Sequence, residues 1–156
     1  MNVIFLDIDG VLNCETTEEK IRHSRGIENE KLKLLKEIRD VSNSEIVLIS
    51  SWKDEPANSI YRKYLVEKLA AYGMKIYAET EEEHWSLRVL GIRDFLEKSD
   101  VDNFVILDDT EFRGYNDEDL RGHWIHTEET DAITGQTSCG LKKEHVDIAI
   151  KILGQH

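Results

Sequence analysis

Short apolar runs separated by amphipathic stretches organise this chain of 156 residues. The first run, from Val3 to Leu6, does not alternate with polar residues, which is typical of a strand buried on both faces in a parallel sheet. Comparable runs predict further strands at residues 45–50, 74–78, 103–107 and 122–127.

Apolar residues at helical spacing predict helices between these strands. One helix is expected from Asn29, a second is expected to begin near Pro56 and to end at Gly73, and a third is expected from Trp85. A closing helix is lined by apolar residues between 146 and 153. The polar stretches 14–28, 110–120 and 128–139 are expected to be loops.

Strands that alternate with helices indicate a parallel sheet, because each parallel neighbour needs a crossover that is usually a helix. The predicted fold class is therefore α/β, with a doubly wound, Rossmann-like, five-stranded parallel sheet and helices on both faces. The intervals between the strands hold only loops and core helices, so no separate cap domain is predicted. Residues 1–156 are expected to form a single domain.

Polar side chains follow several of these strands directly. Asp7, Asp9 and Gly10 follow the first strand, the pair Ser50-Ser51 ends the second, and the pair Asp108-Asp109 follows the fourth. Open α/β sheets bind ligands at the carboxyl ends of their strands, so these residues are candidates for a site. A lone Asp-x-Asp-Gly also fits a simple turn after a strand.

The composition limits the partners that this chain could bind. Its net charge of −12 disfavours long nucleic acids, because binding to the phosphate backbone needs clustered Lys and Arg. The longest apolar runs are of strand length, so no membrane span is predicted. The N-terminal residues lack the features of a secretory signal, and a cytoplasmic location is expected. Cys14 and Cys139 are accordingly expected to be free thiols.

The order and context of these motifs resemble the haloacid dehalogenase-like (HAD) superfamily. The resemblance rests on Asp7-x-Asp9-Gly10, Ser50, Arg88 and Asp108-Asp109, and it covers nearly the whole chain. The segments Asp-Ile-Asp-Gly-Val-Leu-Asn, Ser-Ser-Trp-Lys and Ile-Leu-Asp-Asp are similar to those of a small capless group. That group includes the phosphatase-like domains of RNA-repair proteins.

The resemblance implies a magnesium-dependent phosphomonoester hydrolase. Asp7 would attack the phosphoryl group and form an aspartyl phosphate, and Asp9 would act as general acid and then as general base. Mg²⁺ would bind the Asp7 carboxylate, the Asp9 carbonyl and one aspartate of the final pair, with Asp109 favoured as the direct ligand and Asp108 as its support.

The same resemblance implies a set of substrate-binding residues. Ser50 would hydrogen-bond a phosphoryl oxygen, with Ser51 as the alternative, and Gly10 would contribute beside them. Arg88 would supply a cation to the phosphoryl group, a role that Lys75 or Lys98 could also fill. The substrate is expected to be a small phosphorylated molecule or an exposed phosphate end.

Two other classes of protein share parts of this pattern. The alternative function is a non-catalytic phosphate-binding or protein-binding module that keeps the HAD-like fold. A response-regulator receiver shares the doubly wound sheet and an acidic pocket, but its motifs would follow different strands. The set Asp7, Asp9, Ser50 and Asp109 favours the enzyme.

Overall fold

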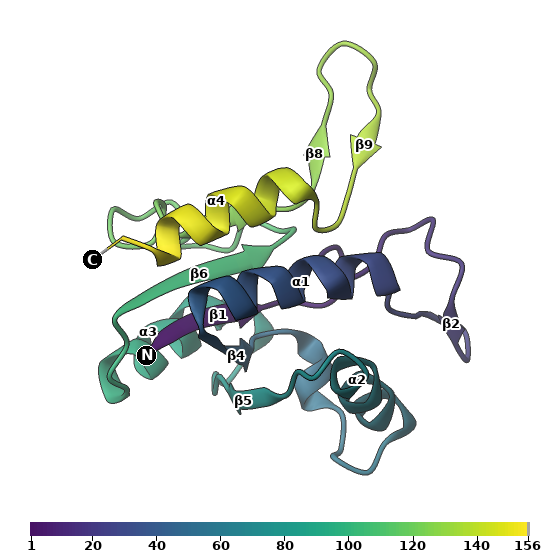
Figure 1. Ribbon diagram of the computed structural model, residues 1–156, viewed down its shortest axis with the longest axis horizontal. Helices are drawn as coiled ribbons and strands as arrows, with labels where there is room; N and C mark the ends of the chain where they lie inside the picture. Colours follow the sequence, from purple (N-terminus) through teal and green to yellow (C-terminus); the bar gives the residue numbers. More distant parts are fainter. Residues whose placement is uncertain (156) are drawn as a thin grey trace.

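A five-stranded parallel sheet forms the centre of the molecule (Figure 1), which a computed structural model describes for residues 1–155. The strand order is β5-β4-β1-β6-β7, so the predicted fold class is confirmed. The chain adds strands to one side of β1 and then to the other. The strand bounds are Asn2–Leu6 for β1, Ser44–Leu48 for β4, Ile76–Glu79 for β5, Asn103–Asp108 for β6 and Trp124–His126 for β7.

Strand β1 is central and pairs with β4 and with β6 over its whole length. Residues 3–6 are completely buried, as the unalternated apolar run predicts. Ile4 and Leu6 point into one core layer, whereas Val3 and Phe5 point into the other. Both faces of β1 are therefore buried, which is why its residues 3–6 are all apolar.

Helices cover both faces of the sheet. Helices α1 and α4 contribute to the core layer of Ile4 and Leu6, together with α2 near the edge strand β5. Helix α3 and the loop after β6 contribute to the opposite layer. The helix bounds are Asn29–Ser42 for α1, Ile60–Ala70 for α2, Arg88–Lys98 for α3 and Lys143–Leu153 for α4, and 3-10 turns lie at Ser51–Asp54 (η1) and Trp85–Leu87 (η2).

The second helix begins later than the sequence predicts. Residues 51–54 form the turn η1, and α2 begins only after Ser59, whose hydroxyl accepts a hydrogen bond from the Arg62 amide. This Ser is a better N-cap than Pro56 is a first helical residue, because it satisfies an amide that would otherwise lack a partner.

Two of the expected loops contain small antiparallel hairpins. The first pairs β2 (Lys20–Ile21) with β3 (Ser24–Arg25), and the second pairs β8 (Glu129–Thr130) with β9 (Thr137–Ser138). The β8–β9 hairpin projects from the body of the molecule (Figure 1). Their strands are too short to give a periodic pattern, so the sequence predicted irregular loops there.

The prediction of free thiols is wrong. Cys14 and Cys139 are joined by a disulfide, although 125 residues separate them in the chain. The fold brings the loop after β1 beside the end of the β8–β9 hairpin, and this proximity cannot be read from the spacing of the cysteines. None of the helices within residues 1–155 has the length and apolar character that crossing a membrane requires.

Candidate active site

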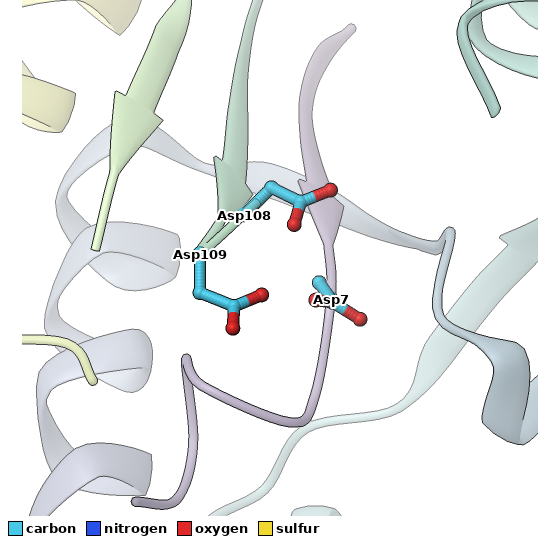
Figure 2. Close-up of side chains that lie close together, drawn as sticks. All are labelled: Asp7, Asp108 and Asp109. Carbon is cyan, nitrogen blue, oxygen red and sulfur yellow. The ribbon is translucent and has the colours of Figure 1, made fainter. Parts of the chain in front are cut away.

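Three carboxylates meet at the carboxyl ends of the two central strands. Leu6 of β1 pairs with Leu107 of β6, so the next residues, Asp7 and Asp108, lie side by side, and the Asp7 amide donates to the Leu107 carbonyl at 3.0 Å. Oxygens of Asp7, Asp108 and Asp109 all lie within 4.8 Å of one another, and Figure 2 shows the side chains facing a common space. This place is the topological switch point of the sheet, where open α/β folds bind ligands.

The electrostatics of this cluster are those of crowded, desolvated acids. Burial raises the pKa of Asp7 well above its usual range, and the neighbouring Asp108 and Asp109 raise it further, while Arg88 opposes them. Burial also raises the pKa of Asp109. A hydrogen bond with Asp7 lowers this pKa, whereas the charge of Asp108 raises it. Like charges held this close destabilise the ionised forms unless a cation joins them.

Arg88 is the guanidinium that faces the cluster. It lies at the start of α3, its Nη1 donates to Asp108 Oδ2 at 2.8 Å, and the same nitrogen lies 3.5 Å from Asp7 Oδ2. Phe112 packs on its other side, with the guanidinium carbon 4.2 Å from the ring centroid. Burial alone would lower the pKa of Arg88, but Asp7 and Asp108 outweigh this and raise it, so the side chain stays charged.

The alternative cations lie elsewhere. Lys98 ends α3 and pairs with Asp94 at 2.9 Å, and Lys75 precedes β5 and so lies towards the amino end of the sheet. The buried Nε of Arg88 has no hydrogen-bond partner within residues 1–155. A buried donor without a partner is costly unless a ligand or a water molecule supplies an acceptor.

Asp108 and Asp109 differ in how fully they are hydrogen-bonded. Asp108 Oδ2 accepts from Arg88 and from the Tyr115 hydroxyl at 2.6 Å, and its Oδ1 accepts from the Thr110 amide at 3.1 Å. Among the described residues, the Asp109 carboxylate accepts a hydrogen bond from one donor only, the Thr110 hydroxyl, at a long distance of 3.3 Å. Asp108 is thus already saturated, which leaves Asp109 better able to bind a cation directly.

Gly10 lets the loop after β1 approach Asp109. Its φ of +81° is in the left-handed region, and a Cβ at this position would lie only 2.2 Å from Asp109 Oδ2. Its carbonyl also accepts a hydrogen bond of 2.8 Å from the buried Thr127 hydroxyl. Glycine is therefore required here both by backbone conformation and by space.

Asp9 is held by two donors that the sequence did not indicate. Asn13 Nδ2 donates to Asp9 Oδ1 at 2.9 Å, and the indole Nε1 of Trp52 donates to Asp9 Oδ2 at 3.0 Å. Asn13 also accepts from the Gly10 amide at 3.0 Å, so it ties the loop together. Trp52 therefore connects the segment that follows β4 to Asp9.

The two candidate serines have different surroundings. Ser50 is almost completely buried, and its hydroxyl oxygen accepts from the Trp52 amide at 3.2 Å as the N-cap of η1. Ser51 is exposed and lies on the wall of a cavity beside Asp9. The hydroxyl hydrogen of Ser50 remains able to donate to a ligand.

The signals for the unpredicted residues were weak. Trp52 and Tyr115 are ordinary core residue types, and Asn13 is a common loop residue. Only the proximity of Asn13 and Trp52 to the Asp7-x-Asp9 and Ser50 motifs could have indicated them, whereas nothing in the sequence singles out Tyr115.

Comparison with known families places the chain in the HAD-like superfamily, which its fold and its motifs also indicate. Residues 3–138 match the family described as the HAD domain in Swiss Army Knife RNA repair proteins. The match covers most of the chain, so this protein belongs to that HAD domain family, as the motifs predict. Searches of the curated proteins and of the solved structures found no match.

Proposed function

We propose that this protein is a magnesium-dependent phosphomonoester hydrolase that acts through an aspartyl phosphate on Asp7. The observation that carries the proposal is the cluster of Asp7, Asp108 and Asp109 beside the buried guanidinium of Arg88. Membership of the HAD domain family supports it.

The donor set fits a hard divalent cation. All three side chains offer carboxylate oxygens, which Mg²⁺ prefers, and the pKa of Asp7 is raised first by its burial and then by the neighbouring carboxylates, with Arg88 opposing them. Asp7 and Asp109 would hold the ion together with the Asp9 carbonyl, while Asp108 orients Arg88. When bound, the ion would offset the negative charge of the carboxylates and of the phosphoryl group.

The protein's own residues account for the remaining steps. Asp7 attacks phosphorus, and the bond from phosphorus to the leaving oxygen breaks as Asp9 donates a proton to that oxygen. Asp9 then accepts a proton from the water that attacks the aspartyl phosphate, which releases inorganic phosphate and restores Asp7. Ser50 and the free Nε of Arg88 hold the phosphoryl oxygens.

The test is release of phosphate from p-nitrophenyl phosphate with Mg²⁺ and in excess chelator. Turnover with Mg²⁺ and its loss in chelator support the proposal. Absence of turnover under both conditions, with a folded protein, would favour a non-catalytic module instead.

A further inference from the structure

A cavity of about 510 Å³ opens on the side of Asp9. Its wall includes Trp52 and Tyr61 from the segment after β4, and His23 and Arg25 from the β2–β3 hairpin. Because Asp9 is the proposed proton donor to the leaving oxygen, the leaving group of a substrate would occupy this cavity. The residues of its wall therefore determine which leaving groups fit.

Arg25 is the arginine of this wall, and it has no ion-pair partner among residues 1–155. It is partly buried, yet within the described part of the chain no carboxylate lies at ion-pair distance from it. By contrast, Lys53, Arg62 and Arg88 around the same strand ends all pair with acids. A partly desolvated guanidinium without a partner is costly unless a ligand supplies the anion.

The hairpin that carries Arg25 is fastened to the site. Asn13 Nδ2, which donates to Asp9, also donates to the Gly26 carbonyl at 3.0 Å, and the Gly26 amide donates to the Glu19 carbonyl at 2.8 Å. The hydroxyl of Tyr64 accepts from the Ile27 amide at 2.8 Å and donates to the Glu19 carboxylate. The backbone next to Arg25 is therefore held in a defined position relative to Asp9.

Tyr64 keeps these contacts over the physiological pH range. Burial and the hydrogen bond to Glu19 raise the pKa of Tyr64 to about 12, so its hydroxyl remains a donor. A Cβ on Gly26 would lie 2.7 Å from that hydroxyl, so a glycine is needed for the hairpin to pack this closely. The arrangement is preorganised, which reduces the entropic cost of binding a ligand.

We propose that this cavity binds a second phosphate carried by the leaving group, so that the preferred substrates are bisphosphorylated. The proposal rests on the hydrolase function proposed above. Arg25 would bind the second phosphate through its planar set of N–H donors, and His23 lies beside it on the same wall. Because the chain as a whole carries a net charge of −12, the attraction for the second phosphate is confined to the neighbourhood of Arg25.

Glu55 gives the proposal a second, opposite test. This exposed carboxylate lines the same cavity and would repel a second phosphate. Removing its charge should therefore strengthen binding of a bisphosphate, whereas removing the charge of Arg25 should weaken it. A merely structural role for either residue would not produce opposite signs.

The experiment compares paired substrates that differ only in the second phosphate. Alkanediol bisphosphates and the matching hydroxyalkyl phosphates, with spacers from ethylene to hexamethylene, are assayed with Mg²⁺ for kcat and KM. Arg25→Gln and Glu55→Gln are compared with wild type. Arg121→Gln is the matched control, because this exposed arginine precedes β7 at the opposite edge of the sheet.

At the best spacer we expect a kcat/KM about tenfold higher for the bisphosphate, mainly through KM, after correction for its two equivalent ends. Arg25→Gln should lower the ratio of the two kcat/KM values, bisphosphate over hydroxyalkyl phosphate, to about one. Glu55→Gln should increase this ratio, and Arg121→Gln should leave it unchanged. Equal kcat/KM for both members of every pair in wild type would overturn the proposal while leaving the hydrolase function intact.

A binding measurement separates this inference from the hydrolase function. Calorimetry with the non-hydrolysable alkane bisphosphonates and hydroxyalkyl phosphonates needs no turnover. If p-nitrophenyl phosphate and all other substrates are inert, the hydrolase proposal fails, but a bisphosphonate preference that Arg25→Gln removes would still support the cavity's specificity. Equal affinity for both phosphonates would overturn it.

Discussion

Gly10 lies so close to Asp109 that a Cβ at Gly10 would come within 2.2 Å of Asp109 Oδ2. The loop after β1 can therefore pass the carboxylate pair of β6 only because residue 10 lacks a side chain. This contact joins the two strand ends that carry the candidate site.

Gly10→Ala should displace Asp109 and strain a backbone with positive φ. We expect activity to fall by roughly a hundredfold or more, since a small misplacement of a reacting geometry has effects of this size. Phosphate release and thermal unfolding check this. Gly73→Ala is the control, because that glycine also has positive φ but has open space around it. Unchanged activity in Gly10→Ala would contradict the assignment of Asp109 to the site.

Tyr115→Phe should weaken Mg²⁺ binding without unfolding the protein. The change removes the 2.6 Å hydrogen bond to Asp108, and groups that orient metal-site residues typically contribute about 10- to 100-fold in affinity. The measurement is the Mg²⁺ concentration that gives half-maximal activity. Tyr77→Phe serves as the control, because this tyrosine is exposed. If Tyr115→Phe needs no more Mg²⁺ than wild type, Asp108 does not depend on this bond.

Much of this arrangement could be predicted from the sequence. The unbroken apolar run of β1 and the acids that follow β1 and β6 place Asp7, Asp108 and Asp109 at one sheet edge, because the ends of parallel strands converge there. The role of Trp52 could not be predicted, since its bond to Asp9 spans 43 residues and depends on the geometry of η1. The disulfide of Cys14 likewise depends on tertiary contact.

Trp52→Phe should keep most of the packing but remove the indole N–H that donates to Asp9. A hydrogen bond to a charged group contributes about 1.5–3 kcal/mol, so we expect roughly a tenfold or greater loss of kcat. The loss should be larger for an alkyl phosphate, whose leaving oxygen needs protonation, than for p-nitrophenyl phosphate. Trp85→Phe, a change at an exposed tryptophan, is the control. An equal loss with both substrates would indicate that Trp52 acts only in packing.

Ser50→Ala should reduce catalysis by roughly ten- to a hundredfold, because one hydrogen bond to a charged phosphoryl group is lost. Ser51→Ala should have a smaller effect, since Ser51 is exposed whereas Ser50 is buried at the strand end. Steady-state kinetics on both variants decide between them. The reverse ranking would assign the phosphoryl contact to Ser51.

Asp7→Asn should be more stable than wild type in chelator at neutral pH. Burial raises the native pKa of Asp7, so between its unfolded and native pKa values the folded state holds more protons than the unfolded state. The free energy of unfolding then falls as pH rises through this window. Above the native pKa of Asp7, the full loss of stability caused by its ionised, buried carboxylate is present.

Each unit of pKa difference costs about 1.4 kcal/mol, or a few degrees in Tm for a chain of this size. Scanning calorimetry in chelator should therefore show a higher Tm for Asp7→Asn at neutral pH, and a difference that shrinks in acid. Added Mg²⁺ should raise the Tm of wild type more than that of the variant. A variant less stable than wild type in chelator at neutral pH would contradict the cost assigned to this carboxylate.

The central claim is that Asp7 forms a covalent phosphoryl intermediate which Asp9 helps to hydrolyse. In Asp9→Asn, p-nitrophenolate can still leave without an acid, but hydrolysis of the aspartyl phosphate lacks its base. Rapid mixing of this variant with p-nitrophenyl phosphate and Mg²⁺, followed by acid quenching and intact-mass analysis, tests the claim directly. We expect a burst of nitrophenol and protein that carries one phosphoryl group on Asp7. No burst and no adduct, with slow turnover still measurable, would contradict it.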